Sequence, residues 1–209
     1  MNGPRRFIVT GTDTGVGKTV FAAGLAAHLR ADYWKPVQAG LTGETDSVEV
    51  ARLAGGRATI LAEGYRLTTP CSPHEAARID GVTIELARLA LPAGEGPLVV
   101  EGAGGVLVPH ADGLLAVDLF ARWGLSVVLV ARTSLGTINH TLLSLEALHA
   151  RGIAVLGVVF SGDAEPVAEE AIARIGVVRH LGRLPRLEPL NSNTLAKAFA
   201  AHIDTAAFA

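Results

Sequence analysis

The sequence has little cysteine, little net charge and no basic run. Cys71 is the only cysteine among 209 residues, so no internal disulfide bond can form. A reducing compartment is the simplest interpretation. The formal net charge is −2 and basic residues are not clustered. The composition therefore indicates neither a nucleic-acid partner nor an anionic membrane surface.

Long apolar runs are also missing. The most apolar segments, Leu125–Ala131 and Ile153–Phe160, are far shorter than the roughly 20 residues that cross a bilayer. Met1–Arg6 leads directly into an apolar segment and lacks the features of a secretory signal. We therefore expect a cytoplasmic protein without a membrane span.

What the sequence does have is a regular alternation of short apolar runs and helix-like stretches. Six runs are predicted as strands: Phe7–Thr10, Tyr33–Val37, Leu98–Glu101, Val127–Ala131, Val155–Phe160 and His180–Gly182. Helical spacing is predicted from Gly17 to Leu29, over Asn139–Arg151, over Glu165–Ile175 and after Leu190. The pattern predicts an α/β fold in which residues 1–209 form a single-domain, doubly wound, mainly parallel β-sheet flanked by helices.

A glycine-rich segment, Gly11–Thr19, lies between the first predicted strand and the first predicted helix. Gly15 and Gly17 allow the backbone to curl around phosphate oxygens, and the following helix adds free N–H groups. Lys18 would reach the β- and γ-phosphates, and the Thr19 hydroxyl can bind Mg²⁺. The spacing departs from G-x-x-x-x-G-K-[ST] only at Thr12, and a simple strand-to-helix turn is the alternative.

Three charged residues occupy positions where ligands bind in open α/β folds. Lys35 and Glu101 close predicted strands, and parallel strands present their carboxyl ends at one edge of the sheet. The Glu101 carboxylate is suited to bind Mg²⁺. The Lys35 ammonium can offset negative charge that develops during phosphoryl transfer. Asp46 begins a predicted helix, where an ordinary N-cap is the alternative role.

Six segments together resemble the dethiobiotin synthetases, a family with the P-loop NTPase fold. They are Gly11–Thr19, Lys35-Pro36-Val37, Asp46, Ser72-Pro73-His74, Val100–Gly105 and Gly136–His140. The resemblance extends from Phe7 to about Leu187. It implies a ligase of biotin biosynthesis that uses ATP and Mg²⁺ to carboxylate 7,8-diaminononanoate with CO₂ and to close a urea ring. The reaction would pass through a carbamic–phosphoric anhydride and give dethiobiotin, ADP and phosphate.

The resemblance also implies roles for individual residues. Catalytic roles fall on Lys18, Lys35 and Thr14, and metal binding falls on Thr19, Asp46 and Glu101. Nucleotide contacts fall on Gly15, Val16, Gly17, Lys18, Thr19, Glu101, Gly102, Ala103, Gly104, Ser161, Pro185, Arg186 and Leu187. Substrate contacts fall on Thr14, Lys35, Ala39, Gly136, Thr137, Ile138 and Asn139. The last four would come from the neighbouring subunit of a homodimer.

Three positions depart from the family pattern. Gly15 stands where an acidic residue is common, and Ala39 where Ser or Thr is common, so two side-chain contacts are absent. Ser161-Gly162-Asp163 replaces Asn-Asp after the strand that ends at Phe160. A relaxed nucleotide preference is the resulting hypothesis.

Two other functions are alternatives for a sequence with such a loop. An amidotransferase related to cobyrinic acid a,c-diamide synthase would need a glutaminase domain, for which these 209 residues leave no room. A regulatory switch ATPase of the MinD or ParA type would carry a signature lysine where this sequence has Asp13.

Overall fold

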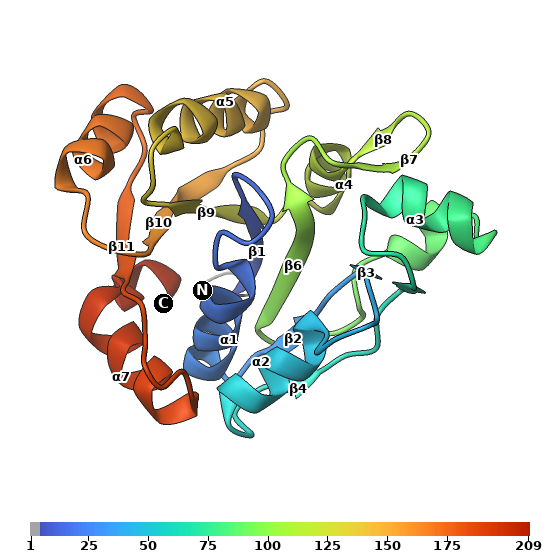
Figure 1. The fold of residues 1–209 in the computed structure, drawn as a ribbon, viewed down its shortest axis with the longest axis horizontal. Coiled ribbons are helices and arrows are strands. Elements are labelled where there is room, and N and C mark those ends of the chain that lie inside the picture. The colour runs from blue at the N-terminus through green and yellow to red at the C-terminus, as the bar shows by residue number, and fades with distance from the viewer. Residues whose placement is uncertain (1–4) are drawn as a thin grey trace.

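The computed structural model describes residues 5–209, and its centre is a parallel sheet of seven strands in the order β11-β10-β9-β1-β6-β2-β4 (Figure 1). The strands are β1 (Arg6–Gly11), β2 (Asp32–Trp34), β4 (Thr59–Ile60), β6 (Leu98–Gly105), β9 (Ser126–Arg132), β10 (Val155–Ser161) and β11 (His180–Leu184). Every pairing in this sheet is parallel. The predicted doubly wound α/β class is thus confirmed.

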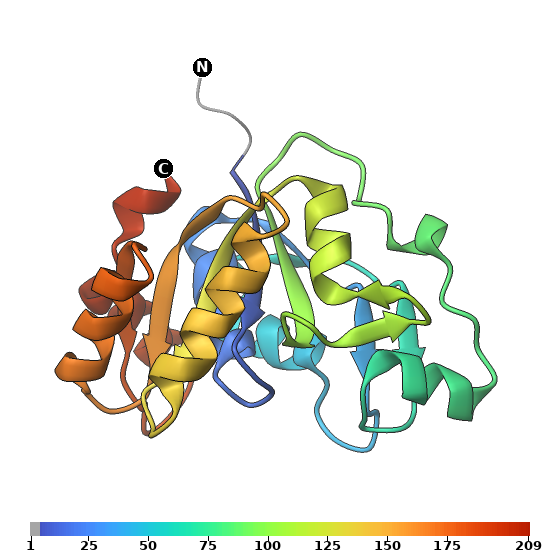
Figure 2. The ribbon, with the colours of Figure 1, turned by 90° about the horizontal axis from the view of Figure 1, so that it is seen from above.

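Helices cover both faces of the sheet, as Figures 1 and 2 show. One face carries α1 (Lys18–Leu29), α2 (Asp46–Ala54) and α7 (Ser192–His202), and the other carries α4 (Ala116–Trp123), α5 (Thr137–His149) and α6 (Pro166–Ile175). Successive residues of β1 serve the two layers alternately, because side chains of a strand point to opposite faces. Phe7 and Val9 pack toward the α1 layer, and Ile8 packs toward the α4 layer.

Smaller elements lie at the β2 side of the sheet. A parallel pair joins β3 (Val37–Ala39) to β5 (Tyr65–Leu67), and an antiparallel pair joins β7 (Pro109–Ala111) to β8 (Leu114–Leu115). Helix α3 (Pro73–Asp80) packs on β3, β5 and β7. Two 3-10 turns complete the fold, at Leu86–Leu89 and Thr205–Phe208. Within residues 5–209, none of the helices combines the length and apolar character needed to span a bilayer.

The predicted strand Tyr33–Val37 is the main difference from expectation. The structure divides this segment into β2 of the central sheet and β3 of the two-stranded sheet, with Lys35 and Pro36 between them. Pro36 has no backbone N–H and cannot continue a hydrogen-bonded ladder. The break places Lys35 immediately after β2, at the ligand-binding edge.

Helix α1 is buried on more sides than the sequence predicts, since the spacing of its apolar residues indicates only one buried face. Its residues from Phe21 to Ala27 are all buried, because α2 and α7 flank the helix while the sheet lies beneath it. Alanines and Gly24 supply the small side chains that allow this close packing. The loop that precedes α1 is therefore mounted on a helix held on several sides.

Candidate active site

The loop between β1 and α1 lies at the carboxyl edge of the central strand. Gly15 and Gly17 both have positive φ angles, 71° and 95°, which glycine adopts without a steric penalty. A Cβ atom at Gly17 would also overlap the Ser161 hydroxyl group. Gly17 is the N-cap of α1, so free N–H groups of the first helical turn face the loop. The segment has the form of a phosphate-binding loop.

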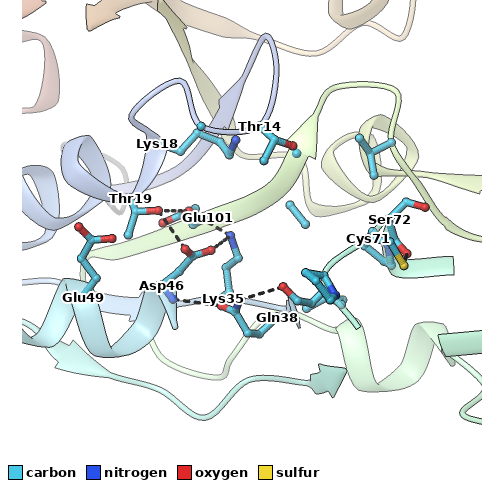
Figure 3. A pocket seen from close by; sticks show the side chains of 18 of the residues that line it. Thr14, Lys18, Thr19, Lys35, Gln38, Asp46, Glu49, Cys71, Ser72 and Glu101 are labelled. Carbon is cyan, nitrogen blue, oxygen red and sulfur yellow. Dashed lines mark hydrogen bonds and ion pairs between the residues drawn. The ribbon is translucent and has the colours of Figure 1, made fainter. Parts of the chain in front are cut away.

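Three oxygen-bearing side chains converge beside this loop (Figure 3). Thr19 Oγ1 donates to Glu101 Oε1 over 2.9 Å and also lies 3.2 Å from Asp46 Oδ1. These residues come from α1, α2 and β6. Among residues 5–209, no group of three or more His, Cys, Asp and Glu side chains is arranged to hold a metal ion. The hydroxyl of Thr19 with the carboxylates of Asp46 and Glu101 is the candidate cation site, because these oxygens meet beside the loop.

Lys35 is the buried cation of the same cluster. Its Nζ lies 2.5 Å from Asp46 Oδ2 and 3.0 Å from Glu101 Oε1, and it also donates to the Gly102 carbonyl over 3.0 Å. The Lys35 side chain is only 3% exposed. Strand β6 continues past its predicted end at Glu101, with an irregular register that brings the Gly102 carbonyl within reach.

The two site lysines differ in how firmly they hold a proton. Burial lowers the pKa of Lys18 to about 8, and the nearby Lys35 ammonium adds to the effect, while surrounding carboxylates oppose it. Burial acts in the same direction on Lys35, but Glu101 and Asp46 outweigh it, so the pKa of Lys35 is raised. Lys35 is thus a fixed positive charge. Bound phosphate would raise the pKa of Lys18 again.

A cavity of about 650 Å³ opens beside these groups. Eleven residues predicted for the site line it: Thr14, Gly15, Gly17, Lys18, Thr19, Lys35, Ala39, Asp46, Glu101, Ala103 and Gly104. Its far wall is formed by Pro70–Pro73, with Cys71 and Ser72 on the side opposite Thr19 (Figure 3). The cavity is bounded by an anion-binding loop on one side and by both polar and apolar residues elsewhere. Such walls suit a small substrate that has polar and apolar parts.

A second cavity of about 500 Å³ lies on the other side of the loop. It shares Gly15 and Gly17 with the first cavity and is also lined by Val16, Ser161, Pro185 and Arg186. Because one loop separates the two cavities, a nucleotide whose phosphates occupy the loop can extend its base into the second cavity. The structure therefore places the predicted catalytic and metal-binding residues at the first cavity and three predicted nucleotide contacts, Ser161, Pro185 and Arg186, at the second.

Some predicted residues line neither cavity. Gly102 contributes its carbonyl to Lys35, and Leu187 packs against the core beneath α7. Gly136, Thr137, Ile138 and Asn139 form the start of α5 and line neither cavity of their own chain. Their contact with a substrate bound to the neighbouring subunit stays a prediction.

Two buried site residues were not predicted from sequence. The Tyr33 hydroxyl donates to Glu101 Oε2 over 2.9 Å, and burial together with Glu101 raises the pKa of this phenol. Tyr33 precedes Lys35 by two positions, and residues two apart in a strand point to the same face. This spacing is the sequence feature that could have placed Tyr33 near Lys35. Gln38 Oε1 accepts from the Asp46 backbone N–H over 3.2 Å and positions the start of α2. No sequence motif marks Gln38.

The fold and the loop define a P-loop NTPase. A sequence-family model described as an AAA domain matches residues 5–194. The crystal structure of a ParA family ATPase from Chlorobium tepidum TLS superposes with a TM-score of 0.55, covering 97% of this chain and 99% of that chain. The sequence identity is 12%, so this similarity concerns the fold alone.

Close relatives identify the family within that class. A protein of Agrobacterium fabrum named ATP-dependent dethiobiotin synthetase BioD is 60% identical over 204 residues, which cover 97% of this chain and 96% of the relative. A protein of the same name from Rhodopseudomonas palustris strain BisB5 is 59% identical over 202 residues, covering 96% and 95%. The chain belongs to the dethiobiotin synthetase family.

Proposed function

We propose that this protein is an ATP-dependent dethiobiotin synthetase, a cyclo-ligase that acts on 7,8-diaminononanoate, CO₂ and ATP. The observation that carries the proposal is the position of Lys35, whose buried ammonium lies beside the phosphate loop and opens onto the larger cavity. A switch ATPase has no need of a substrate cavity at that point. Full-length identity near 60% with named synthetases supports the same function.

In the proposed reaction one amine of the substrate captures CO₂, loses a proton and becomes a carbamate. A carbamate oxygen attacks the γ-phosphorus, ADP leaves, and a carbamic–phosphoric anhydride remains. The neighbouring amine then attacks the anhydride carbonyl, which closes the urea ring and releases phosphate. No protein nucleophile takes part, so the protein acts by positioning and by stabilising charge.

The chain's own residues divide these tasks. Lys18 and the loop N–H groups bind the phosphates, while Lys35 faces the carbamate from the opposite wall of the cavity. The Thr14 hydroxyl lines the same cavity and is proposed to orient the carbamate. Ala39 also lines it and offers only a methyl group to the substrate chain.

The oxygen set beside the loop suits Mg²⁺. One hydroxyl lies within hydrogen-bonding distance of two carboxylates, and Mg²⁺ prefers oxygen ligands completed by phosphate and water. We propose that Thr19, Asp46 and Glu101 would hold this ion, which supplies neutralising charge to the phosphates. Tyr33 and Lys35 fix the orientation of the Glu101 carboxylate.

We also propose a cytoplasmic homodimer in which each substrate site includes the partner's Gly136–Asn139 segment. The support is an apolar surface beside that segment, where Leu135 is 102% exposed and Leu143 is 55% exposed. Free N–H groups at the start of α5 can receive the carboxylate of a substrate. The adenine base would lie near Ser161, Pro185 and Arg186.

The test is phosphate release from ATP and Mg²⁺ with 7,8-diaminononanoate and bicarbonate, combined with mass detection of the product. We expect turnover that requires both co-substrates and yields dethiobiotin. Phosphate release that is indifferent to the diamine would contradict the proposal and favour a switch ATPase.

A further inference from the structure

Arg132 occupies a position between the phosphate loop and the second cavity. It is the last residue of β9, whose neighbour β1 leads into the loop, and the Val130 carbonyl accepts from the Thr12 backbone N–H over 3.0 Å. The Arg132 side chain lines the second cavity together with Gly15 and Gly17. A rigid strand thus places a guanidinium beside the outer side of the loop.

The hydrogen bonds of this guanidinium are incomplete. Arg132 Nη2 lies 3.5 Å from Asp13 Oδ2, a long ion pair, and the other Asp13 oxygen, Oδ1, accepts from the Thr14 backbone N–H over 2.7 Å. Arg132 Nε is buried and has no hydrogen-bond partner among residues 5–209. The side chain as a whole is 37% exposed, so its Nη groups, held only by the long Asp13 ion pair, are open to an acceptor supplied by a ligand.

Two arginines, Arg132 and Arg186, and two acidic residues, Asp163 and Glu165, line the second cavity. Its other cation, Arg186, is 77% exposed and lies 3.4 Å from the Asp163 carboxylate, so Arg132 is the more enclosed of the two. A planar guanidinium binds phosphate oxygens through paired N–H groups. If the phosphates of a nucleotide bind in the loop and its base lies in the second cavity, the phosphate chain passes Arg132 on its way from one to the other.

We propose that Arg132 is a nucleotide-binding residue whose guanidinium donates to a phosphate oxygen on the base side of the loop. This inference rests on the proposed use of ATP and adds a contact that neither Lys18 nor the loop N–H groups can make. In this arrangement Asp13 holds the guanidinium in place before the nucleotide arrives. The Arg132 Nη groups then obtain a closer acceptor from the nucleotide than the Asp13 carboxylate provides.

A competing explanation is that Arg132 only steadies the loop through Asp13. Equilibrium binding of ADP to the full chain separates the two, using Arg132→Met, Asp13→Asn and the double variant. A direct contact predicts that Arg132→Met raises Kd for ADP on the order of 10-fold or more, while Asp13→Asn changes it much less. Arg132→Lys keeps the charge but loses the planar donors, so we expect an intermediate Kd.

The outcomes are distinct. Arg122→Met removes an exposed arginine of α4 and is expected to leave Kd unchanged. Equal losses in Arg132→Met and Asp13→Asn that do not add in the double variant would overturn the direct contact. An unchanged Kd in both Arg132→Met and Arg132→Lys would overturn it as well. Failure of the unaltered protein to bind ADP would instead count against the proposed use of ATP.

Discussion

At the scale of single residues, the site concentrates the lysines of this chain. The sequence has three lysines, and Lys18 and Lys35 are buried at the loop whereas Lys197 is exposed on α7. Lys35→Ala removes the charge that is proposed to face the carbamate, so we expect turnover to fall by about 100-fold or more. Lys197→Ala should keep full activity. The measurement is steady-state dethiobiotin formation, with ADP binding as evidence that Lys35→Ala still folds. Near-normal turnover in Lys35→Ala would remove Lys35 from the mechanism.

His110 gives a pH prediction of its own. This residue of β7 is buried, and burial lowers its pKa to about 4. A hydrogen bond with the Val108 carbonyl opposes the shift, and the nearby Lys35 ammonium adds to it. The unfolded chain therefore binds a proton near pH 6.5 that the folded chain does not bind until about pH 4. Stability should fall as the pH drops through this window, by about 1 kcal/mol at pH 5.5 from this group.

Urea unfolding of the unaltered protein and of His110→Gln at several pH values isolates that contribution. The stability of His110→Gln should depend less on pH between about pH 4 and 6.5. Parallel pH curves for the two proteins would show that His110 is not responsible.

How far the site could be predicted depends on where each residue lies along its strand or helix. Lys35 and Asp46 follow local signals, a strand end before proline and a helix start, and the structure brings them within 2.5 Å. Gln38 carries no such signal, because its contact with the Asp46 backbone depends on how β3 turns away from the central sheet. Arg132 was not recognised either, since its relation to Asp13 exists only after β9 pairs with β1.

At the scale of elements, local pattern located the strands but not all of their limits. The sequence predicts one strand over Tyr33–Val37 because every residue of this run except Lys35 is apolar or aromatic. In the structure, however, Pro36 divides the run between two sheets. Helix α1 was predicted from one apolar stripe, and its burial on further sides depends on α2 and α7. The limits of a strand and the buried sides of a helix depend on packing partners that are distant in sequence. The periodicity of a single segment carries no information about those partners.

The contact between α1 and α7 is tested by Gly24→Val. A Cβ at Gly24 would overlap the Phe199 ring, so the two helices would have to separate. We expect a loss of about 1–3 kcal/mol in the free energy of unfolding, measured with urea, and an unchanged KM for ATP. Gly96→Val is the control, because a Cβ at Gly96 meets no atom within 4 Å. A stable Gly24→Val protein would mean that α7 can move aside without cost.

At the scale of the whole molecule, the strand–helix alternation predicts a doubly wound fold but leaves the strand order open. The order β11-β10-β9-β1-β6-β2-β4 places the loop after β1 between β6 and β9. This position is why one loop can serve two cavities, with the proposed metal-binding residues and the two lysines on the β6 side and Ser161 on the β10 side. Each cavity is built from segments that are distant in sequence, so neither could be located before the order was known.

The start of α5 is the part of the proposed site that one chain leaves incomplete. Leu143 is exposed beside it, and a charge there would oppose burial against a second copy. Leu143→Asp is therefore expected to shift the protein from the proposed dimer to a monomer in light-scattering measurements and to raise KM for 7,8-diaminononanoate. Kd for ADP should stay unchanged, because both cavities at the loop belong to one chain. Leu86→Asp, in the 3-10 turn Leu86–Leu89, makes the same change at another exposed leucine and should leave the dimer intact. A fully active monomer would show instead that the diamine is held by its own chain, with Pro70–Pro73 as the remaining wall.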